Sequence, residues 1–140
     1  MCVKVKDKSM AKHNETGVIG ENIATKYFEN KGFSVIDRNY RKKWGELDIV
    51  AQKDGVVHFI EVKTVSKRSF GDKFKEEVNG YKPEDNVHSW KIKRLKRAIQ
   101  TYLLEKYKTS DPEWQFDLIC VFLDQERRVA KVRLIENLIL

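Results

Sequence analysis

Two charged strand-like segments, residues 45–50 and 59–63, constrain the fold of this chain more than any other feature. Both are mainly apolar, yet both carry carboxylates, and Asp54-Gly55 lies between them. Asp-Gly between two extended segments is a strong signal for a hairpin with a two-residue turn. Such a turn fixes the register and places Asp48 opposite Glu61. Because like charges directly opposite each other on paired strands are destabilising, this pair of acids indicates a bound cation.

The same register divides the hairpin into two faces, because successive side chains of a strand point to opposite sides. It pairs Glu46 with Lys63. One face is then expected to carry Glu46, Asp48, Glu61 and Lys63, and the other to carry Leu47, Ile49, Ala51, His58, Ile60 and Val62. We therefore expect one face to form core and the other to carry out chemistry.

Length and charge limit the class of protein. The 140 residues are enough for one domain, expected over residues 14–140 after a flexible tail at residues 1–13. The net charge of +7 favours a polyanionic partner such as nucleic acid. Two cysteines indicate neither a disulfide framework nor a zinc site. No segment reads as a signal peptide or membrane span, so we expect a cytoplasmic protein without a membrane partner.

The remaining patterns complete an element order. Helical periodicity is expected over residues 14–31 and again from Ser89 to Lys106, with a long loop at 65–86 before the second helix. Strands are expected at 33–40, 46–64 (as the hairpin), 116–123 and 128–134. This order predicts an α/β (α+β) domain with a central mixed sheet of about five strands flanked by helices. A helix crossing over to the fourth strand would create a parallel pair.

Asp48 followed by Glu61-Val62-Lys63 resembles the PD-(D/E)XK nuclease motif. Further segments fall in order around it: Gly20-Glu21, Gly32-Phe33, Arg38-Asn39-Tyr40, Lys91 to Leu95 and Phe116-Asp117. Together they resemble the YraN-type family of small predicted endonucleases over roughly residues 17 to 135. The layout is also similar to archaeal Holliday-junction resolvases. The resemblance implies a restriction-endonuclease-like fold and metal-dependent cleavage of phosphodiester bonds.

Carboxylates suit hard divalent ions, so Mg²⁺ is the expected cofactor and Mn²⁺ its substitute. Asp48 and Glu61 are expected to be direct ligands. The resemblance implies that the carbonyl of Val62 and the carboxylate of Glu21 complete the metal site, and that Lys63 acts on the attacking water and the phosphate. The chain departs from the family pattern at Val65, where the family usually carries arginine; Lys67 or Arg68 is a candidate substitute.

Several further residues are assigned supporting roles. Glu46 is expected to tune Lys63 across the strands, and Lys91 to hold a phosphate. Non-specific contacts to a nucleic-acid backbone are expected from Arg41, Lys42, Lys43, Lys93, Arg94 and Arg97. Trp44 and Tyr40 are interpreted as core aromatics near a turn, His58 as a core histidine, and Asp117 as a partner for an arginine or a backbone group.

Two functions remain open at this stage. The first is an endonuclease, for which DNA is favoured over RNA as substrate and branched or structured DNA is a candidate. The alternative is a catalytically silent nucleic-acid-binding module with the same fold. A third interpretation of Asp48, Glu61 and Lys63 is an ordinary surface salt bridge, and Glu21 could be an ordinary helix carboxylate. The resemblance to resolvases allows a homodimer, although no residue pattern indicates one.

Overall fold

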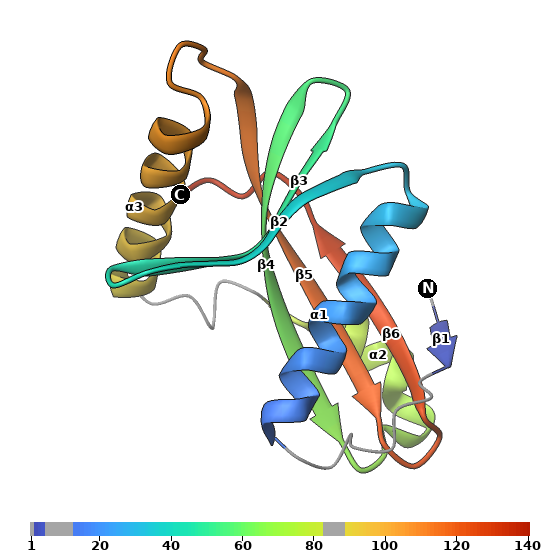
Figure 1. Ribbon diagram of the computed structural model, residues 1–140. Coiled ribbons are helices and arrows are strands. Elements are labelled where there is room, and N and C mark those ends of the chain that lie inside the picture. Colours follow the sequence, from blue (N-terminus) through green and yellow to red (C-terminus); the bar gives the residue numbers. More distant parts are fainter. Residues whose placement is uncertain (1, 5–12, 83–88) are drawn as a thin grey trace.

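Six strands form one mixed sheet in the order β1-β6-β5-β4-β3-β2. The computed structural model describes residues 2–4, 13–82 and 89–140, and Figure 1 shows their arrangement. The elements are β1 (Cys2–Lys4), α1 (His13–Asn30), β2 (Ser34–Lys42), β3 (Gly45–Lys53), β4 (Val56–Lys67), a 3-10 turn η1 (Gly71–Lys73), α2 (Phe74–Gly80), α3 (Ser89–Lys106), β5 (Glu113–Asp124) and β6 (Val129–Ile135).

The predicted α+β class with a mixed sheet is confirmed. β4 and β5 are parallel over twelve residue pairs, from Val56↔Glu113 to Lys67↔Asp124, as expected for strands joined by a helical crossover. The other neighbouring strands pair antiparallel.

Two segments differ from expectation. Residues 2–4, assigned to a flexible tail, form β1 on the edge of β6. The predicted loop at 65–86 contains the end of β4 together with η1 and α2. The remainder of these two predictions, at residues 5–12 and 83–86, lies outside the described residues.

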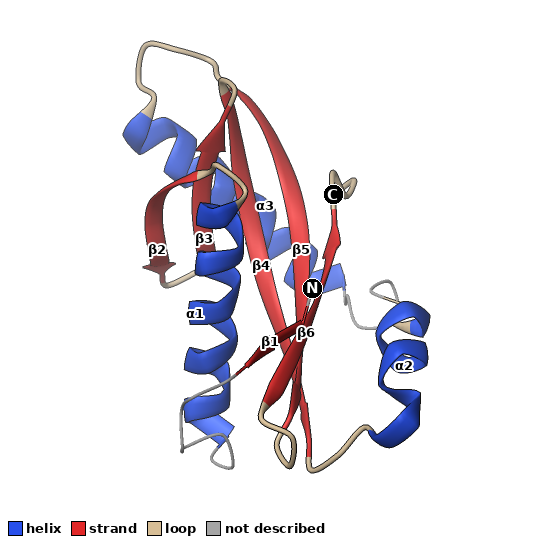
Figure 2. Ribbon diagram, turned by 90° about the vertical axis from the view of Figure 1, so that its right-hand side faces the viewer, coloured by secondary structure: helices blue, strands red, loops and turns tan. Residues whose placement is uncertain are grey.

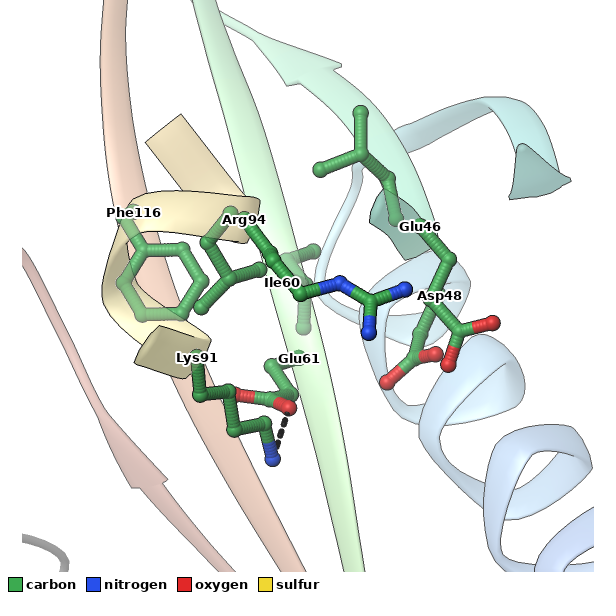
Figure 3. Close-up of a pocket in the computed structure, with 9 residues that line it drawn as sticks. Glu46, Asp48, Ile60, Glu61, Lys91, Arg94 and Phe116 are labelled. Atoms are coloured by element: carbon green, nitrogen blue, oxygen red, sulfur yellow. Dashed lines mark ion pairs between the residues drawn. The ribbon is translucent and has the colours of Figure 1, made fainter. Parts of the chain in front are cut away.

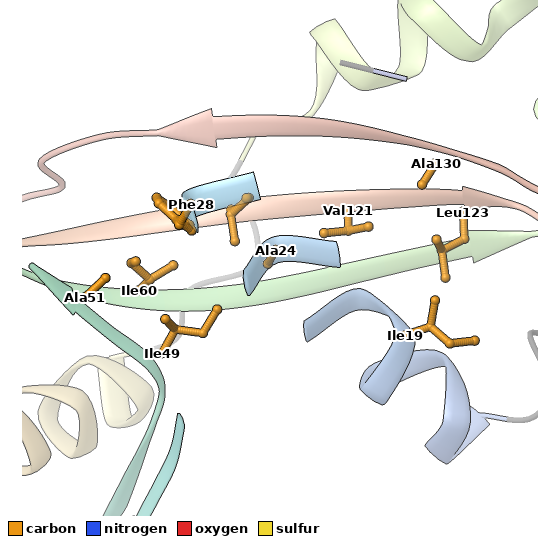
Figure 4. Packing of buried hydrophobic residues seen from close by; sticks show 10 residues of the cluster. Ile19, Ala24, Phe28, Ile49, Ala51, Ile60, Val121, Leu123 and Ala130 are labelled. Atoms are coloured by element: carbon orange, nitrogen blue, oxygen red, sulfur yellow. The ribbon is translucent and has the colours of Figure 1, made fainter. Parts of the chain in front are cut away.

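Helices cover both faces of the sheet. Figure 2 shows α1 along one face, with α2 and α3 on the other. On the α1 side, Ile19, Ala24 and Phe28 pack against strand residues that include Ile49, Ile60 and Val121 (Figure 4). On the opposite side, α3 packs its apolar residues against β3, β4 and β5, while η1 and α2 cover the other end of β5. The sheet is therefore buried on both sides along its central strands.

The hairpin turn and its register follow the prediction. Asp54 and Gly55 both have positive φ, 51° and 78°, as a two-residue turn of this kind requires. The ladder pairs residues from Lys53↔Val56 to Ile49↔Ile60, which is the predicted register. It stops there, one pair short of Asp48 and Glu61.

The prediction of one apolar and one polar face was wrong. Ile49 and Ala51 pack beneath α1, but Leu47, expected on the same face, packs beneath α3. Val50 is also buried, on the α3 side. The faces exchange at Asp48, which falls opposite Asn39 in the β2–β3 register; Asn39 has a positive φ of 53°. Asn39 belongs to β2, so it marks an irregularity of the neighbouring strand; within β3 the exchange coincides with the end of the pairing with β4 at Ile49↔Ile60.

The described helices contain none that is long and apolar enough to cross a membrane.

Candidate active site

The candidate site lies where β3 separates from β4. Beyond Ile49↔Ile60 the two strands are no longer paired, while β3 stays paired with β2 as far as Gly45↔Lys42 and β4 stays paired with β5. Figure 1 shows the β2–β3 end turning away toward α3 while β4 continues beside β5. We call this region the fork. Asp48 and Glu61 are the first residues on either side of it.

At the fork the Asp48 side chain supplies the hydrogen-bond acceptor that a neighbouring strand would otherwise offer to Val62. Its Oδ2 accepts a hydrogen bond of 2.8 Å from the backbone N–H of Val62. A buried backbone N–H needs an acceptor, and here no opposite strand provides one. The predicted direct pairing of Asp48 with Glu61 is thus replaced by a side-chain contact one residue further along β4.

The fork strongly perturbs the Asp48 carboxyl. Burial raises its pKa from 3.8 to about 7, and the negative charges of Glu61, Glu21 and Glu46 add to the rise. The hydrogen bond from Val62 opposes these effects because it favours the charged form. A carboxyl group whose ionised form is disfavoured by three other carboxylates is a position where a cation would stabilise that form.

Glu61 already has a cationic partner. Its Oε1 forms an ion pair with the Nζ of Lys91 on α3, drawn as a dashed line in Figure 3. The Glu61 side chain is only 15% exposed, so the pair is largely removed from water on the carboxylate side. Lys91 was expected to hold a phosphate; in the structure it holds Glu61.

One cavity collects the predicted catalytic residues. Its lining includes Glu21, Glu46, Asp48, Glu61, Val62, Lys63 and Lys91. Glu21 comes from the half-buried flank of α1, Lys63 is exposed on β4, and Glu46 is exposed on β3, 3.7 Å from Arg41. A second, adjacent pocket between the strands and α3 shares Glu46, Asp48, Glu61 and Lys91 and adds Arg94 (Figure 3). The structure therefore brings together residues that are up to 70 positions apart in the chain.

Two glycines allow the helices to approach the fork closely. A Cβ atom added at Gly20 on α1 would lie 1.9 Å from Oγ1 of Thr64 on β4. A Cβ added at Gly45 would lie 2.5 Å from the backbone oxygen of Arg94 on α3. These contacts set the distance of Glu21 and Lys91 from the strands. Gly45 was not recognised as a positioning residue from sequence, since nothing local shows that a helix fifty residues later will contact it.

The basic turn between β2 and β3 is attached to α3. Trp44 donates a hydrogen bond of 3.2 Å from Nε1 to Thr101 Oγ1, and the Arg97 guanidinium lies 5.0 Å from the centre of its ring. Arg94 Nε donates to the Trp44 carbonyl. Trp44 is therefore a half-buried aromatic held against α3, and not the core residue predicted; Tyr40 is the one that packs against the core beneath α3. The predicted basic residues of the turn and of α3 therefore lie on neighbouring elements beside the cavity, with Lys43 and Lys93 exposed.

Other assignments near the site are also resolved. His58 is buried, as predicted, with Nδ1 2.7 Å from Asp117 Oδ2. Asp117 also accepts the backbone N–H of Asn137, so it holds a backbone group and a histidine. Lys67, a candidate substitute for the family's arginine, pairs with Glu77 at 2.7 Å on the outside of the molecule. Gln125 and Ser66, which sequence reasoning did not identify, line the cavity and bond to each other at 2.9 Å.

The donor atoms fit a hard divalent ion, but they are not gathered as a finished metal site. The cavity offers carboxylate oxygens, the ligands that Mg²⁺ and Mn²⁺ prefer, and Asp48 is strongly influenced by its negative neighbours. Within residues 2–4, 13–82 and 89–140, however, no three acidic, histidine or cysteine side chains lie close enough together to hold an ion. In this arrangement the ammonium group of Lys91 is the cation on Glu61.

Comparison with known proteins identifies the family. Residues 20–121 match the model described as uncharacterised protein family UPF0102. The chain belongs to the UPF0102 family. A UPF0102 protein of Flavobacterium psychrophilum is 33% identical over 91% of this chain and 96% of its own length. One of Campylobacter fetus is 37% identical over 86% of this chain and 90% of its own. This is the YraN-type family that the motifs resembled, and the matched range contains every candidate site residue.

Proposed function

We propose that this protein is a metal-dependent endonuclease that hydrolyses phosphodiester bonds in nucleic acid, with DNA as its substrate. The observation that carries the proposal is the cavity at the fork, which is lined by four carboxylates from α1, β3 and β4 together with Lys63 and Lys91. Such a concentration of acids beside two lysines is unfavourable for a merely structural surface, because the acids repel one another. It suits a site that takes up a cation and a phosphate.

The proposed metal ion is Mg²⁺, with Mn²⁺ as a substitute. Asp48 and Glu61 would hold it, with Glu21 and the Val62 carbonyl as further ligands. When bound, such an ion supplies charge neutralisation at the phosphoryl oxygens and a more acidic water. Lys63 is exposed at the cavity, where its three N–H donors can hold the attacking water or a phosphate oxygen. The Asp48 to Val62 hydrogen bond fixes the Asp48 carboxylate at the edge of the cavity.

The proposed substrate follows from the charge around the cavity. Exposed Lys43 on the β2–β3 turn and Lys93 on α3 lie on elements that are attached to each other next to the site. Lysine and arginine side chains in such a position bind the phosphate backbone without reading sequence. A nucleic acid lying on α3 and the turn would pass the fork.

Plasmid nicking by the purified protein with Mg²⁺ or Mn²⁺ tests the proposal, alongside an RNA of matched sequence. We expect Asp48→Asn, Glu61→Gln and Lys63→Met each to reduce cleavage by about 100-fold or more. The matched controls are Glu29→Gln and Lys31→Met. Glu29-Asn30-Lys31 has the same acid-any-lysine spacing, but its acid and lysine are exposed at and just beyond the end of α1. Undiminished cleavage in the fork variants would overturn the assignment.

One observation favours the alternative of a catalytically silent binding module. Glu61 is neutralised by Lys91, and the described part of the chain assembles no three-ligand metal group. This alternative expects salt-sensitive DNA binding, no product with either metal, and binding that survives all three fork substitutions. The nicking assay and a binding titration in EDTA therefore separate the two functions.

A further inference from the structure

Lys91 lies at the junction of the two pockets that meet at the fork. It lines both of them, and its Nζ contacts Oε1 of Glu61. The two partners differ in their surroundings: the Glu61 side chain is 15% exposed, whereas that of Lys91 is 37% exposed. The carboxylate is therefore fixed within the protein, while the ammonium reaches it from the solvent side on a flexible four-carbon stem.

The helix that carries Lys91 is firmly placed. The close approach of Gly45 to the Arg94 carbonyl and the bond from Trp44 to Thr101 attach α3 to the end of the β2–β3 hairpin. Leu95, Ile99 and Tyr102 bury the inner side of α3. Movement of the Lys91 ammonium thus requires only rotation of its own side chain, and no shift of the helix.

We propose that Lys91 is a built-in competitor for the metal site: its ammonium neutralises Glu61 in the metal-free protein and must leave Glu61 when a divalent cation binds. This inference rests on the proposed function. A largely buried carboxylate needs a counter-charge, which Lys91 supplies in the structure. A divalent ion on the same oxygen would repel the ammonium at contact distance, so the two cations exclude each other.

Because Lys91 and the metal ion exclude each other at Glu61, binding of the metal is coupled to binding of the substrate. A nucleic-acid phosphate beside the cavity offers the displaced ammonium a new partner, because lysine binds phosphate as a point charge. Substrate should therefore relieve the competition and raise the affinity for metal, and metal should raise the affinity for substrate by the same factor. In this scheme the fork remains neutralised by its own lysine until phosphate and ion are both present.

The test measures Mn²⁺ binding directly, by electron paramagnetic resonance of free Mn²⁺, without nucleic acid and at about 150 mM salt to screen distant charges. We expect Lys91→Met and Lys91→Gln to bind Mn²⁺ about 10-fold more tightly than the wild type, because the competing cation is gone. Lys91→Arg, which keeps the charge, should bind like the wild type. Lys96→Met, an exposed lysine of the same helix, is the control for removal of one positive charge.

A second readout follows the fold. Removal of Lys91 leaves Glu61 without its counter-charge, so Mn²⁺ should raise the melting temperature of Lys91→Met more than that of the wild type. Equal or weaker Mn²⁺ affinity in both Lys91→Met and Lys91→Gln would overturn the role of Lys91 and leave the metal site standing. An absence of Mn²⁺ binding in every variant would instead overturn the proposed function.

Discussion

Asp48 combines two tasks that place opposite demands on its protonation. It accepts the Val62 N–H at 2.8 Å, which the ionised form does best, and it is partly buried among three other acids, which favours the neutral form. The net result is a pKa raised to about 7. In the metal-free protein the neutral form of this carboxyl is therefore favoured far more than in an ordinary aspartate.

This raised pKa predicts a pH-dependent stability. The folded state binds more protons at Asp48 than the unfolded state does, so the contribution is present below the unfolded pKa near 4 and is lost as the pH rises through about 7. Since one pKa unit corresponds to about 1.4 kcal/mol and Asp48 is only partly buried, we expect a decrease in stability on the order of 1–2 kcal/mol between about pH 5 and about pH 8.

Urea unfolding in EDTA across this range measures the effect. Asp48→Asn is the matched variant, because its amide oxygen can still accept the Val62 N–H while its charge is gone. The free energies of unfolding of the wild type and of Asp48→Asn should differ least at low pH, and the difference should grow as the pH rises. Parallel curves for the two proteins would show that Asp48 titrates near its ordinary value.

The sequence indicated which charged residues lie together at one cavity, but it did not indicate which partners they contact. Asp48, Glu61 and Lys63 could be chosen because a charged residue in an apolar strand is unusual. Their partners could not, because Lys91 lies thirty residues after Glu61 and reaches it only through the packing of α3. His58 was also correctly predicted to lie in the core. Its contact with Asp117 could not be predicted, because that contact depends on the parallel pairing of β4 with β5.

Among the elements, the two helices flanking the fork are positioned by glycine contacts. Gly20 brings α1 against Thr64, and Gly45 brings β3 against the backbone of α3. The two contacts differ in kind: Thr64 can rotate its side chain, whereas a backbone carbonyl can move only with its helix. The Gly45 contact is therefore the stiffer of the two, and it is the one that supports Lys91 and Arg94.

Alanine substitutions at three glycines should follow this order. Gly45→Ala should lower the free energy of unfolding by about 2–3 kcal/mol, since the new methyl group would overlap a backbone oxygen. Gly20→Ala should cost about 1 kcal/mol, because rotation of Thr64 and better helix propensity offset part of the clash. Gly17→Ala is the control in α1; nothing lies within 4 Å of its added Cβ, so it should gain about 0.5–1 kcal/mol.

Chemical denaturation of the three variants provides the comparison. A Gly45→Ala protein as stable as Gly17→Ala would mean that α3 does not rest on Gly45. Removal of the Thr64 hydroxyl and methyl groups in Gly20→Ala/Thr64→Ala should recover part of the stability that Gly20→Ala removes, since the atom at 1.9 Å is then absent.

In the hairpin, the strand register could be predicted from the sequence, but the point where the two strands separate could not. Its register was predictable because the Asp54-Gly55 turn fixes it locally, through two residues with positive φ. The fork was not, because the point where the β3–β4 ladder ends depends on the helices that pack on the two faces of the sheet, and those contacts are remote in the sequence. Period-two alternation therefore assigned Leu47 to the wrong face. β1 was missed because three residues carry too little pattern.

For the whole molecule, the six residues expected to contact a nucleic-acid backbone come from two regions that contact each other. These residues lie at the end of β2, on the β2–β3 turn and on α3, whereas α1 covers the opposite face of the sheet and α2 lies at the other end of it (Figure 2). Some of these charges are balanced within the protein: Lys42 pairs with Glu105 at 3.0 Å and Arg41 with Glu46. The location of the basic residues is thus more informative about nucleic-acid binding than the net charge of +7.

Position rather than net charge should set the salt dependence of nucleic-acid binding. Every phosphate that the protein no longer neutralises lowers the slope of log affinity against log salt by about 0.9 on duplex DNA. The double variant Lys43→Gln/Lys93→Gln should therefore reduce the magnitude of the slope by about 2. The control Lys26→Gln/Lys75→Gln removes the same charge from exposed positions on α1 and α2 and should leave the slope nearly unchanged.

Fluorescence anisotropy with a short DNA duplex in EDTA measures the slopes of both double variants. Equal slopes for the two double variants would show that the protein responds to its total charge, and α3 would no longer be the binding side.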